Sequence, residues 1–256
     1  MYAEERQQAI AVEIRERGRA SVAELSEHFS VTGETVRRDL AVLHRAGSVV
    51  RVHGGAVRLD VAAVVDEPDL SERESAHRPQ KTAIGIAAQR FLPTVGGSVL
   101  FDAGTTTFAA AAGIAGDVRH QFVTNSLPIA TTLTGLARSS VVLIGGRLRP
   151  KTQAAVGADA IDTIARLHAS VGFVGANGLT LAHGLSTPDV DEAAVKRAMM
   201  AACDRVVVLA DSSKINRQEL ACFGAVEDID VLITDDGIDP AFADALSSHD
   251  IEVVTA

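Results

Sequence analysis

The chain has 256 residues, 47% of them hydrophobic and 22% charged, and its formal net charge at pH 7 is −9. No stretch approaches the ~20 consecutive apolar residues needed to cross a bilayer, and the charged start MYAEERQQ lacks the apolar run of a signal peptide. These features exclude a membrane-spanning protein and predict a cytoplasmic protein of one or two domains.

The acidic balance belongs to the larger, C-terminal part of the chain. Residues 1–58 carry nine arginines and eight acidic side chains, whereas residues 59–256 carry 15 basic and 25 acidic side chains. The sequence therefore predicts a modestly basic N-terminal region. Charge alone does not establish nucleic-acid binding there.

The N-terminal region predicts three short helices. Residues 3–17 have the apolar spacing of an amphipathic helix. Ser21 and Glu24 form a capping-box pattern that opens a second helix, AELSEHF. Thr32 can cap a third helix, which runs to about Ala46 and places an apolar stripe against the other two.

The order of these elements favours a winged helix-turn-helix. The second and third helices are joined by a tight turn, and VVRVHGGAV (49–57) alternates and turns as a β-hairpin does. Arginine can pair with guanine edges or phosphates, and threonine can reach a phosphate or a thymine methyl group. A small helical bundle whose arginines only solvate one face is the alternative.

The segment SVAELSEHFSVTGETVRRDLAVLHRAGSVVRVHGGA resembles the N-terminal domain of the DeoR (deoxyribonucleoside repressor) family of bacterial transcriptional regulators. TVRRDL and R-x-HGGA occur together at the separation typical of that family. The resemblance implies a domain over residues 1–58, a helix-turn-helix at about residues 20–39, and double-stranded operator DNA as partner. The residues that it implies face DNA, from the recognition helix and then the wing, are Thr35, Arg37, Arg38, Arg51 and His53.

Residues 59–78 are acidic and aperiodic, which predicts a connector with a short helix near its end. In residues 79–256, apolar runs of strand length end in small or polar residues, and helical stretches follow several of them. The runs are SVLF, QFV, VVLI, VGFV, VVVLA, VLI and EVV. Continuous apolar strands between helices predict an α/β domain with a mainly parallel sheet covered on both faces.

Such sheets bind ligands outside the carboxyl ends of their strands. FDAGTTT (101–107) predicts a strand, a turn and a helix N-terminus, where backbone N–H groups and hydroxyls can hold an anion. For this stretch alone, an ordinary strand-to-helix turn is the alternative. The residues predicted to surround the ligand are Asp102, Gly104, Thr105, Thr106, Thr124, Asn125, Arg147, Lys196, Asp211 and Lys214.

The segment HGLSTPDVDEAAVKRAMM (183–200) has two interpretations. Glu192 and Lys196 lie four residues apart on a helix and could form an exposed ion pair of little energetic weight. Alternatively, Lys196 lies near the anion and the STPD loop covers the ligand.

The region of residues 79–256 resembles the C-terminal sensor domain of the same family. That sensor domain is similar to the ribose-5-phosphate isomerase and glucosamine-phosphate deaminase fold. DAGTTT, IGGRLRP, GLSTPD and LADSSK match the sensor pattern. The opening YAEERQQAI, TQAAVG and LADSSK look closest to actinobacterial fructose-operon repressors. The resemblance implies a phosphorylated sugar effector, with fructose 1-phosphate favoured, and a homo-oligomer, dimer or tetramer. Ser170 and Asn216 depart from the family pattern.

A sugar-phosphate isomerase or deaminase fused to a DNA-binding head is the rival class. Such chemistry needs a positioned base. Where ribose-5-phosphate isomerases carry two carboxylates, this chain reads Gly-Ala-Asn-Gly-Leu (175–179), and Asn177 cannot accept a proton. Cys203 and Cys222 lack metal-ligand spacing, which favours a buried structural role. We therefore expect a transcriptional repressor with no catalytic residue, cofactor or metal, in which Asp102 and Asp211 accept hydrogen bonds from sugar hydroxyls.

Overall fold

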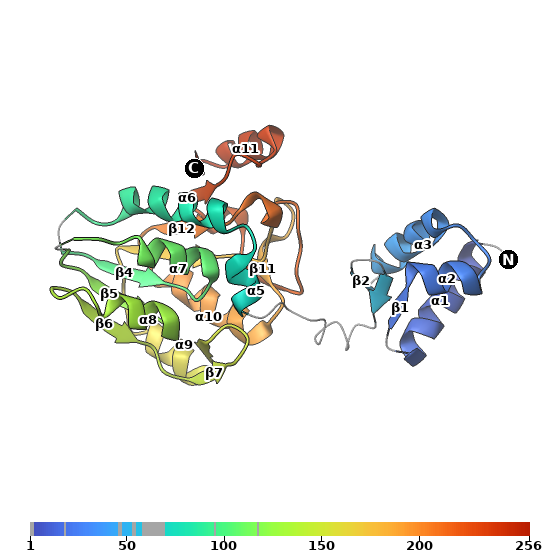
Figure 1. The fold of residues 1–256 in the computed structure, drawn as a ribbon, viewed down its shortest axis with the longest axis horizontal. Coiled ribbons are helices and arrows are strands. Elements are labelled where there is room, and N and C mark those ends of the chain that lie inside the picture. The colour runs from blue at the N-terminus through green and yellow to red at the C-terminus, as the bar shows by residue number, and fades with distance from the viewer. Residues whose placement is uncertain are drawn as a thin grey trace. The chain divides into compact units, whose positions relative to one another are not determined.

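The computed structural model divides the chain into two compact units, Met1–Glu67 and Pro68–Ala256 (Figure 1). Each unit has its own hydrophobic core. The residues that the structure describes are 3–17, 19–45, 48–52, 55–57, 70–94, 96–116 and 118–256. Among them, no helix is long and apolar enough to span a bilayer.

The described part of the first unit combines helices with a small antiparallel sheet of order β1-β3-β2. Its elements are α1 (Ala3–Arg17), β1 (Arg19–Ser21), α2 (Val22–His28), α3 (Gly33–Arg45), β2 (Val50–Val52) and β3 (Gly55–Val57). The helices and the hairpin follow the sequence prediction, whereas β1 adds a strand that was not predicted.

Local hydrogen bonds explain where these helices begin. Ser21 Oγ accepts a hydrogen bond from the Glu24 backbone N–H at 3.1 Å, and Glu24 Oε2 accepts one from the Ser21 N–H at 2.7 Å. This confirms the predicted capping box. Thr32 Oγ1 accepts the Thr35 N–H at 3.3 Å, so it caps the start of α3.

The second unit is built on a seven-stranded parallel sheet of order β15-β14-β12-β9-β4-β5-β6. Its strands are β4 (Ser98–Phe101), β5 (Gln121–Thr124), β6 (Ser140–Leu143), β9 (Val171–Gly175), β12 (Val206–Leu209), β14 (Val231–Thr234) and β15 (Glu252–Thr255). All seven coincide with the predicted apolar runs, which confirms the α/β class.

Helices cover both faces of this sheet (Figure 1). The helices are α5 (Leu70–Ser75), α6 (Arg78–Ala88), η1 (Gln89–Phe91), α7 (Thr105–Ala112), α8 (Leu127–Leu133), α9 (Ala158–Ile164), α10 (Val190–Ala201), η2 (Ser212–Lys214), η3 (Val226–Asp228) and α11 (Pro240–Ser247). Apolar residues of α6, α7 and α8 share one core with the sheet, and those of α9, α10 and α11 pack in the cores of the opposite face.

The described part of this unit also contains two smaller sheets. One is a hairpin of β7 (Arg147–Arg149) and β8 (Ala154–Val156), and the other joins β10 (Gly178–Thr180), β11 (Gly184–Thr187) and β13 (Ala221–Gly224). All of their strand pairs are antiparallel. The segment predicted as a covering loop, STPD, instead begins as the end of β11 and finishes at the start of α10.

The order of the parallel strands reverses beside β4. The chain runs outward from β4 through β5 to β6, and then returns to β9 on the other side of β4. In open α/β sheets, the carboxyl ends of the two strands at such a reversal leave a crevice for ligands. The β4–β9 boundary is therefore the place where the topology predicts a binding site.

Candidate functional site

A cavity of about 270 Å³ lies at the carboxyl ends of β4, β9 and β12. Residues 103–106 follow β4 in its lining, Gly175 and the next two residues come from the end of β9, and Leu209 ends β12. Ligand cavities for drug-sized molecules start at roughly 300 Å³, so this volume suits a small metabolite.

Basic side chains concentrate in this cavity although the chain as a whole is acidic. Three of the four lysines of the chain line it, together with two arginines, against two glutamates. The basic lining residues are Arg73, Lys81, Lys196, Lys214 and Arg217. A concave surface with this charge balance favours an anionic ligand.

The N-terminus of α7 adds uncapped backbone donors to the same wall. Gly104 is the N-cap residue and provides no side-chain cap, and Thr105 and Thr106 begin the helix in the cavity lining. A Cβ at Gly104 would stand 3.1 Å from Thr107 Oγ1, so a side chain there would crowd the turn. The first N–H groups of a helix carry partial positive charge and bind anions.

A buried ion pair fixes Lys196 in the cavity lining. Lys196 Nζ donates to Asp102 Oδ2 and, at 2.9 Å, to the Gly175 carbonyl. Asp102 also accepts the Gly175 N–H at 3.1 Å and is 1% exposed. The interpretation of Lys196 as the exposed partner of Glu192 is therefore wrong. Asp102 positions Lys196 and does not line the cavity.

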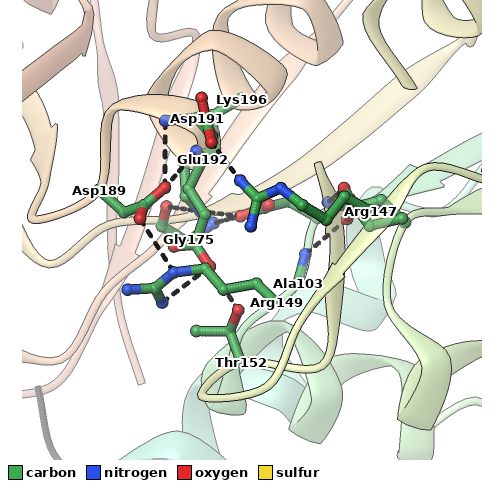
Figure 2. A network of polar contacts seen from close by, with 12 residues as sticks. Ala103, Arg147, Arg149, Thr152, Gly175, Asp189, Asp191, Glu192 and Lys196 are labelled. Atoms are coloured by element: carbon green, nitrogen blue, oxygen red, sulfur yellow. Dashed lines mark hydrogen bonds and ion pairs between the residues drawn. The ribbon is translucent and has the colours of Figure 1, made fainter. Parts of the chain in front are cut away.

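Glu192 belongs to a separate polar network at the start of α10 (Figure 2). It accepts hydrogen bonds from Thr152 and, at 3.3 Å, from Arg149. Asp189 caps α10 through the Glu192 N–H at 2.9 Å and accepts from Arg149 Nε at 3.0 Å. This network fastens the β7–β8 hairpin to α10 beside the cavity.

Three other predicted residues have structural contacts outside the cavity lining. Thr124 Oγ1 accepts the Ser126 N–H at 3.0 Å. Asn125 accepts the Ala103 N–H at 3.1 Å and donates to the Ala155 carbonyl at 3.0 Å, so it holds the turn after β4. Arg147 is exposed and pairs with Asp191 (Figure 2).

The charge of Asp211 acts on two of the cavity lysines, Lys81 and Lys214. One of its oxygens accepts the Ser213 N–H at 3.2 Å and caps η2, while Oδ2 is buried and accepts no hydrogen bond from the described residues. Burial lowers the pKa of Lys81 to about 8 and also lowers the pKa of Lys214, and the Asp211 charge opposes both shifts. Asp211 is absent from the cavity lining, whereas Lys214 is part of it.

Helix α5 and the start of α6 contribute cavity residues that the sequence patterns did not predict. Arg73 and His77 line the cavity although they fall in the predicted connector, and Lys81 lines it from α6. Lys81 occupies the buried face of α6 with Ile84 and Ala88. A lysine on the apolar stripe of a helix is the signal that could have revealed it.

The two family departures have simple structural settings. The Ser170 N–H donates to Ser98 Oγ at 3.1 Å at the start of the strands. Asn216 has φ of +56°, a left-handed conformation that asparagine adopts more readily than most residues. Its N–H donates to the Leu179 carbonyl at 2.8 Å.

In the first unit, α3 presents a basic face. Arg37 and Arg38 are exposed and each lies 3.7 Å from Glu34. Thr35 is half-buried, and its Oγ1 lies 3.0 Å from Thr32 Oγ1. On the opposite side, the predicted apolar stripe is buried: Val36, Leu40 and Leu43.

Asp39 of the TVRRDL motif has a structural setting instead. It is 3% exposed and accepts hydrogen bonds from Arg6 at 2.6 Å and Gln7 at 2.9 Å, which ties α3 to α1. In the predicted wing, Arg51 lies in β2, and His53 lies outside the described residues.

Among the residues that the structure describes, no cluster of His, Cys, Asp and Glu could hold a metal ion. Both cysteines are free and half-buried rather than fully buried. Burial raises the pKa of the Cys203 thiol to about 12, which keeps it a thiol at neutral pH.

Two family models match this chain. The DeoR-like helix-turn-helix domain matches residues 6–61, and the DeoR C terminal sensor domain matches residues 76–236. Together with the winged helix-turn-helix and the parallel-sheet body, they show that the chain belongs to the DeoR family of transcriptional regulators.

Relatives extend over almost the whole chain. HTH-type transcriptional regulator GlpR of Haloferax volcanii is 36% identical over 99% of this chain and 98% of its own length. A putative aga operon transcriptional repressor of Escherichia coli O157:H7 is 31% identical over 98% of this chain and 93% of its own. The glycerol-3-phosphate regulon repressor of Escherichia coli K12 is 30% identical over 94% of each chain. The chain is thus a regulator, as predicted, and not an enzyme.

Solved structures show more distant likeness. A probable sor operon regulator from Shigella flexneri gives a TM-score of 0.44 at 11% identity, over 67% of this chain and 89% of that one. Ribose 5-phosphate isomerase A of Methanocaldococcus jannaschii gives 0.41 at 12% identity, over 55% of each chain.

Proposed function

We propose that this regulator is a repressor that binds operator DNA through its first unit and a phosphorylated sugar through the cavity of its second. The observation that carries the proposal is the concentration of three lysines and the α7 N-terminus around one small cavity. Phosphate needs several N–H donors and positive charge at once, and this cavity supplies both.

The two units have different roles in this proposal, DNA binding and effector sensing. Residues 1–58 bind DNA, with Thr35, Arg37, Arg38, Arg51 and His53 as the contacting residues. The last part of the predicted connector, residues 59–78, belongs to the second unit and contributes to the cavity. Residues 79–256 sense the effector. The protein acts as a homo-oligomer, dimer or tetramer, since paired heads read two half-sites.

Within the cavity, the effector phosphate lies near the α7 N-terminus, Lys214 and Lys196. Gly104, Thr105 and Thr106 provide the backbone and hydroxyl donors. Effector binding releases the operator only if the effector binds the released arrangement more tightly than the DNA-bound one.

We propose fructose 1-phosphate as the effector and a fructose operon as the target. The support is the likeness of YAEERQQAI, TQAAVG and LADSSK to fructose-operon repressors. A relative named for a glycerol-3-phosphate regulon supports the broader class, a small phosphorylated polyol or sugar.

A thermal-shift panel of phosphorylated sugars and their neutral parents tests the effector. A ligand that binds the native state raises the melting temperature, so fructose 1-phosphate should raise it and fructose should not. Operator release is then measured for the same compounds. Equal responses to fructose and its phosphate contradict an anion site. A response to another phosphosugar alone contradicts fructose specificity and leaves the site intact.

A further inference from the structure

Lys81 connects the cavity to the element that begins the second unit. Its side chain donates to the carbonyl oxygens of Arg73 and, at 2.7 Å, of Ala76. These carbonyls lie at the C-terminal end of α5, where a helix has no partners for them of its own. Lys81 is 6% exposed and lines the cavity.

Apolar burial does little to hold this helix in place. None of the residues of α5 is buried, so apolar packing contributes little to its position. It is also the first described element of the second unit, after residues 58–69. His77, which joins it to α6, has φ of +54°, a left-handed conformation uncommon for residues other than glycine.

An ammonium group has three N–H donors. The described contacts of Lys81 use two of them on α5, which leaves the third for a ligand in the cavity. A hydrogen bond from a charged donor to an anion is roughly twice as strong as a neutral one. Such a bond also keeps the lysine protonated, and hence keeps all three donors available.

We propose that an anion bound in the cavity accepts the third N–H of Lys81 and thereby stabilises the docking of α5 on the sensor unit. Occupancy of the cavity is then coupled to the stability of α5, the first described element of the second unit in chain order. This inference rests on the proposed function, because it requires the cavity to bind an anion.

The test measures amide hydrogen exchange of residues 70–76 in the full chain, with and without inorganic phosphate. Calorimetry on the same samples measures phosphate binding independently. We expect phosphate to slow exchange in this segment by about tenfold, as one added charge-assisted hydrogen bond predicts. Binding without any change in exchange overturns the coupling and leaves the anion site standing. Absence of phosphate binding overturns both.

Two variants separate the roles of the lysines. Lys81→Met should speed exchange of residues 70–76 in the free protein and remove the phosphate effect. Lys214→Met should weaken phosphate binding but leave exchange in the free protein as in the wild type. Wild-type exchange in free Lys81→Met also overturns the proposal. If Lys81→Met fails to fold, the comparison of exchange in the wild-type chain with and without phosphate still tests the proposal.

Discussion

Lys214 differs from the other two lysines of the cavity in its contacts. Lys81 and Lys196 donate to protein groups, whereas Lys214 Nζ forms no hydrogen bond or ion pair with the residues that the structure describes. We expect Lys214→Ala to abolish the response to effector while operator binding is retained, because operator contacts lie in the other unit. Titrating effector into the preformed protein–operator complex measures this.

Lys151, the fourth lysine of the chain, supplies the control for that titration. Lys151 lies outside the cavity lining, so Lys151→Ala removes the same charge from the unit without changing the site. It should release the operator as the wild type does. Normal release of Lys214→Ala at the wild-type effector concentration would show that Lys214 does not bind the phosphate.

The protonation of Lys81 gives the anion site a pH dependence. Burial lowers the pKa of Lys81 to about 8, assisted by Lys214 and Arg73 and opposed by Asp211 and Glu74. Above this pH the free protein loses the Lys81 charge, and an anion binds only with uptake of a proton. The affinity for inorganic phosphate should therefore fall as the pH rises from about 7.5 to about 9.5.

Calorimetry at several pH values measures this fall, and Lys81→Met should show a flatter profile. Below the Lys81 pKa the lysine is charged in both the free and the bound protein, so its contribution there is constant. An affinity that stays level or rises over the alkaline range would contradict a role for the Lys81 charge.

Sequence patterns predicted the residue types of the site better than their positions. Thr105, Thr106 and Lys214 follow strand ends and do line the cavity. Asp102 also follows a strand end, but its side chain pairs with Lys196 and does not line the cavity. That pairing joins residues 94 positions apart, and no local pattern encodes it.

At the scale of elements, α3 carries the DNA-binding prediction. Arg37 and Arg38 are exposed on α3, away from its buried stripe, so replacing either with alanine should leave the fold intact. Loss of a base contact should cost about 1–3 kcal/mol and relax sequence preference at one position, whereas loss of a phosphate contact should weaken all sequences alike.

Operator affinity measured at several salt concentrations distinguishes these outcomes, since a lost phosphate contact lowers the salt slope by about one. The unfolding transition of each variant provides the control for stability. Unchanged operator affinity in both variants would contradict the assignment of α3 as the recognition helix.

The elements that the sequence predicted well are those with a strong period or a strong cap. The seven parallel strands are continuous apolar runs, and α2 begins at a complete capping box. The short strands β10, β11 and β13 were missed. Strands β10 and β11 form a short local hairpin without a long apolar run, and β13 pairs with β11 from a distant part of the chain. Helix α5 carries no apolar stripe, and the Lys81 side chain donates to the carbonyls of Arg73 in α5 and of Ala76 just after it, contacts that no local period predicts.

At the scale of the whole molecule, the proposed DNA-binding and anion-binding regions differ in charge from the rest of the chain. The chain is acidic overall, yet the exposed face of α3 and the cavity lining are locally basic. General acidity disfavours non-specific attraction to DNA and to anions, so each basic region acts through its own geometry.

A repressor that an effector releases must couple effector binding in the cavity to operator binding. Coupling free energies are reciprocal, so a phosphosugar that weakens operator binding must itself bind less tightly to the operator complex, by the same factor. That factor is typically about 5–150 for allosteric proteins.

The most direct test is a calorimetric titration of the phosphosugar that most raises the melting temperature. It is titrated into the protein alone and into the protein saturated with operator duplex. We predict a weaker Kd in the presence of operator, by the factor with which the sugar weakens operator binding. Equal Kd values in the two titrations would contradict a repressor released by its effector.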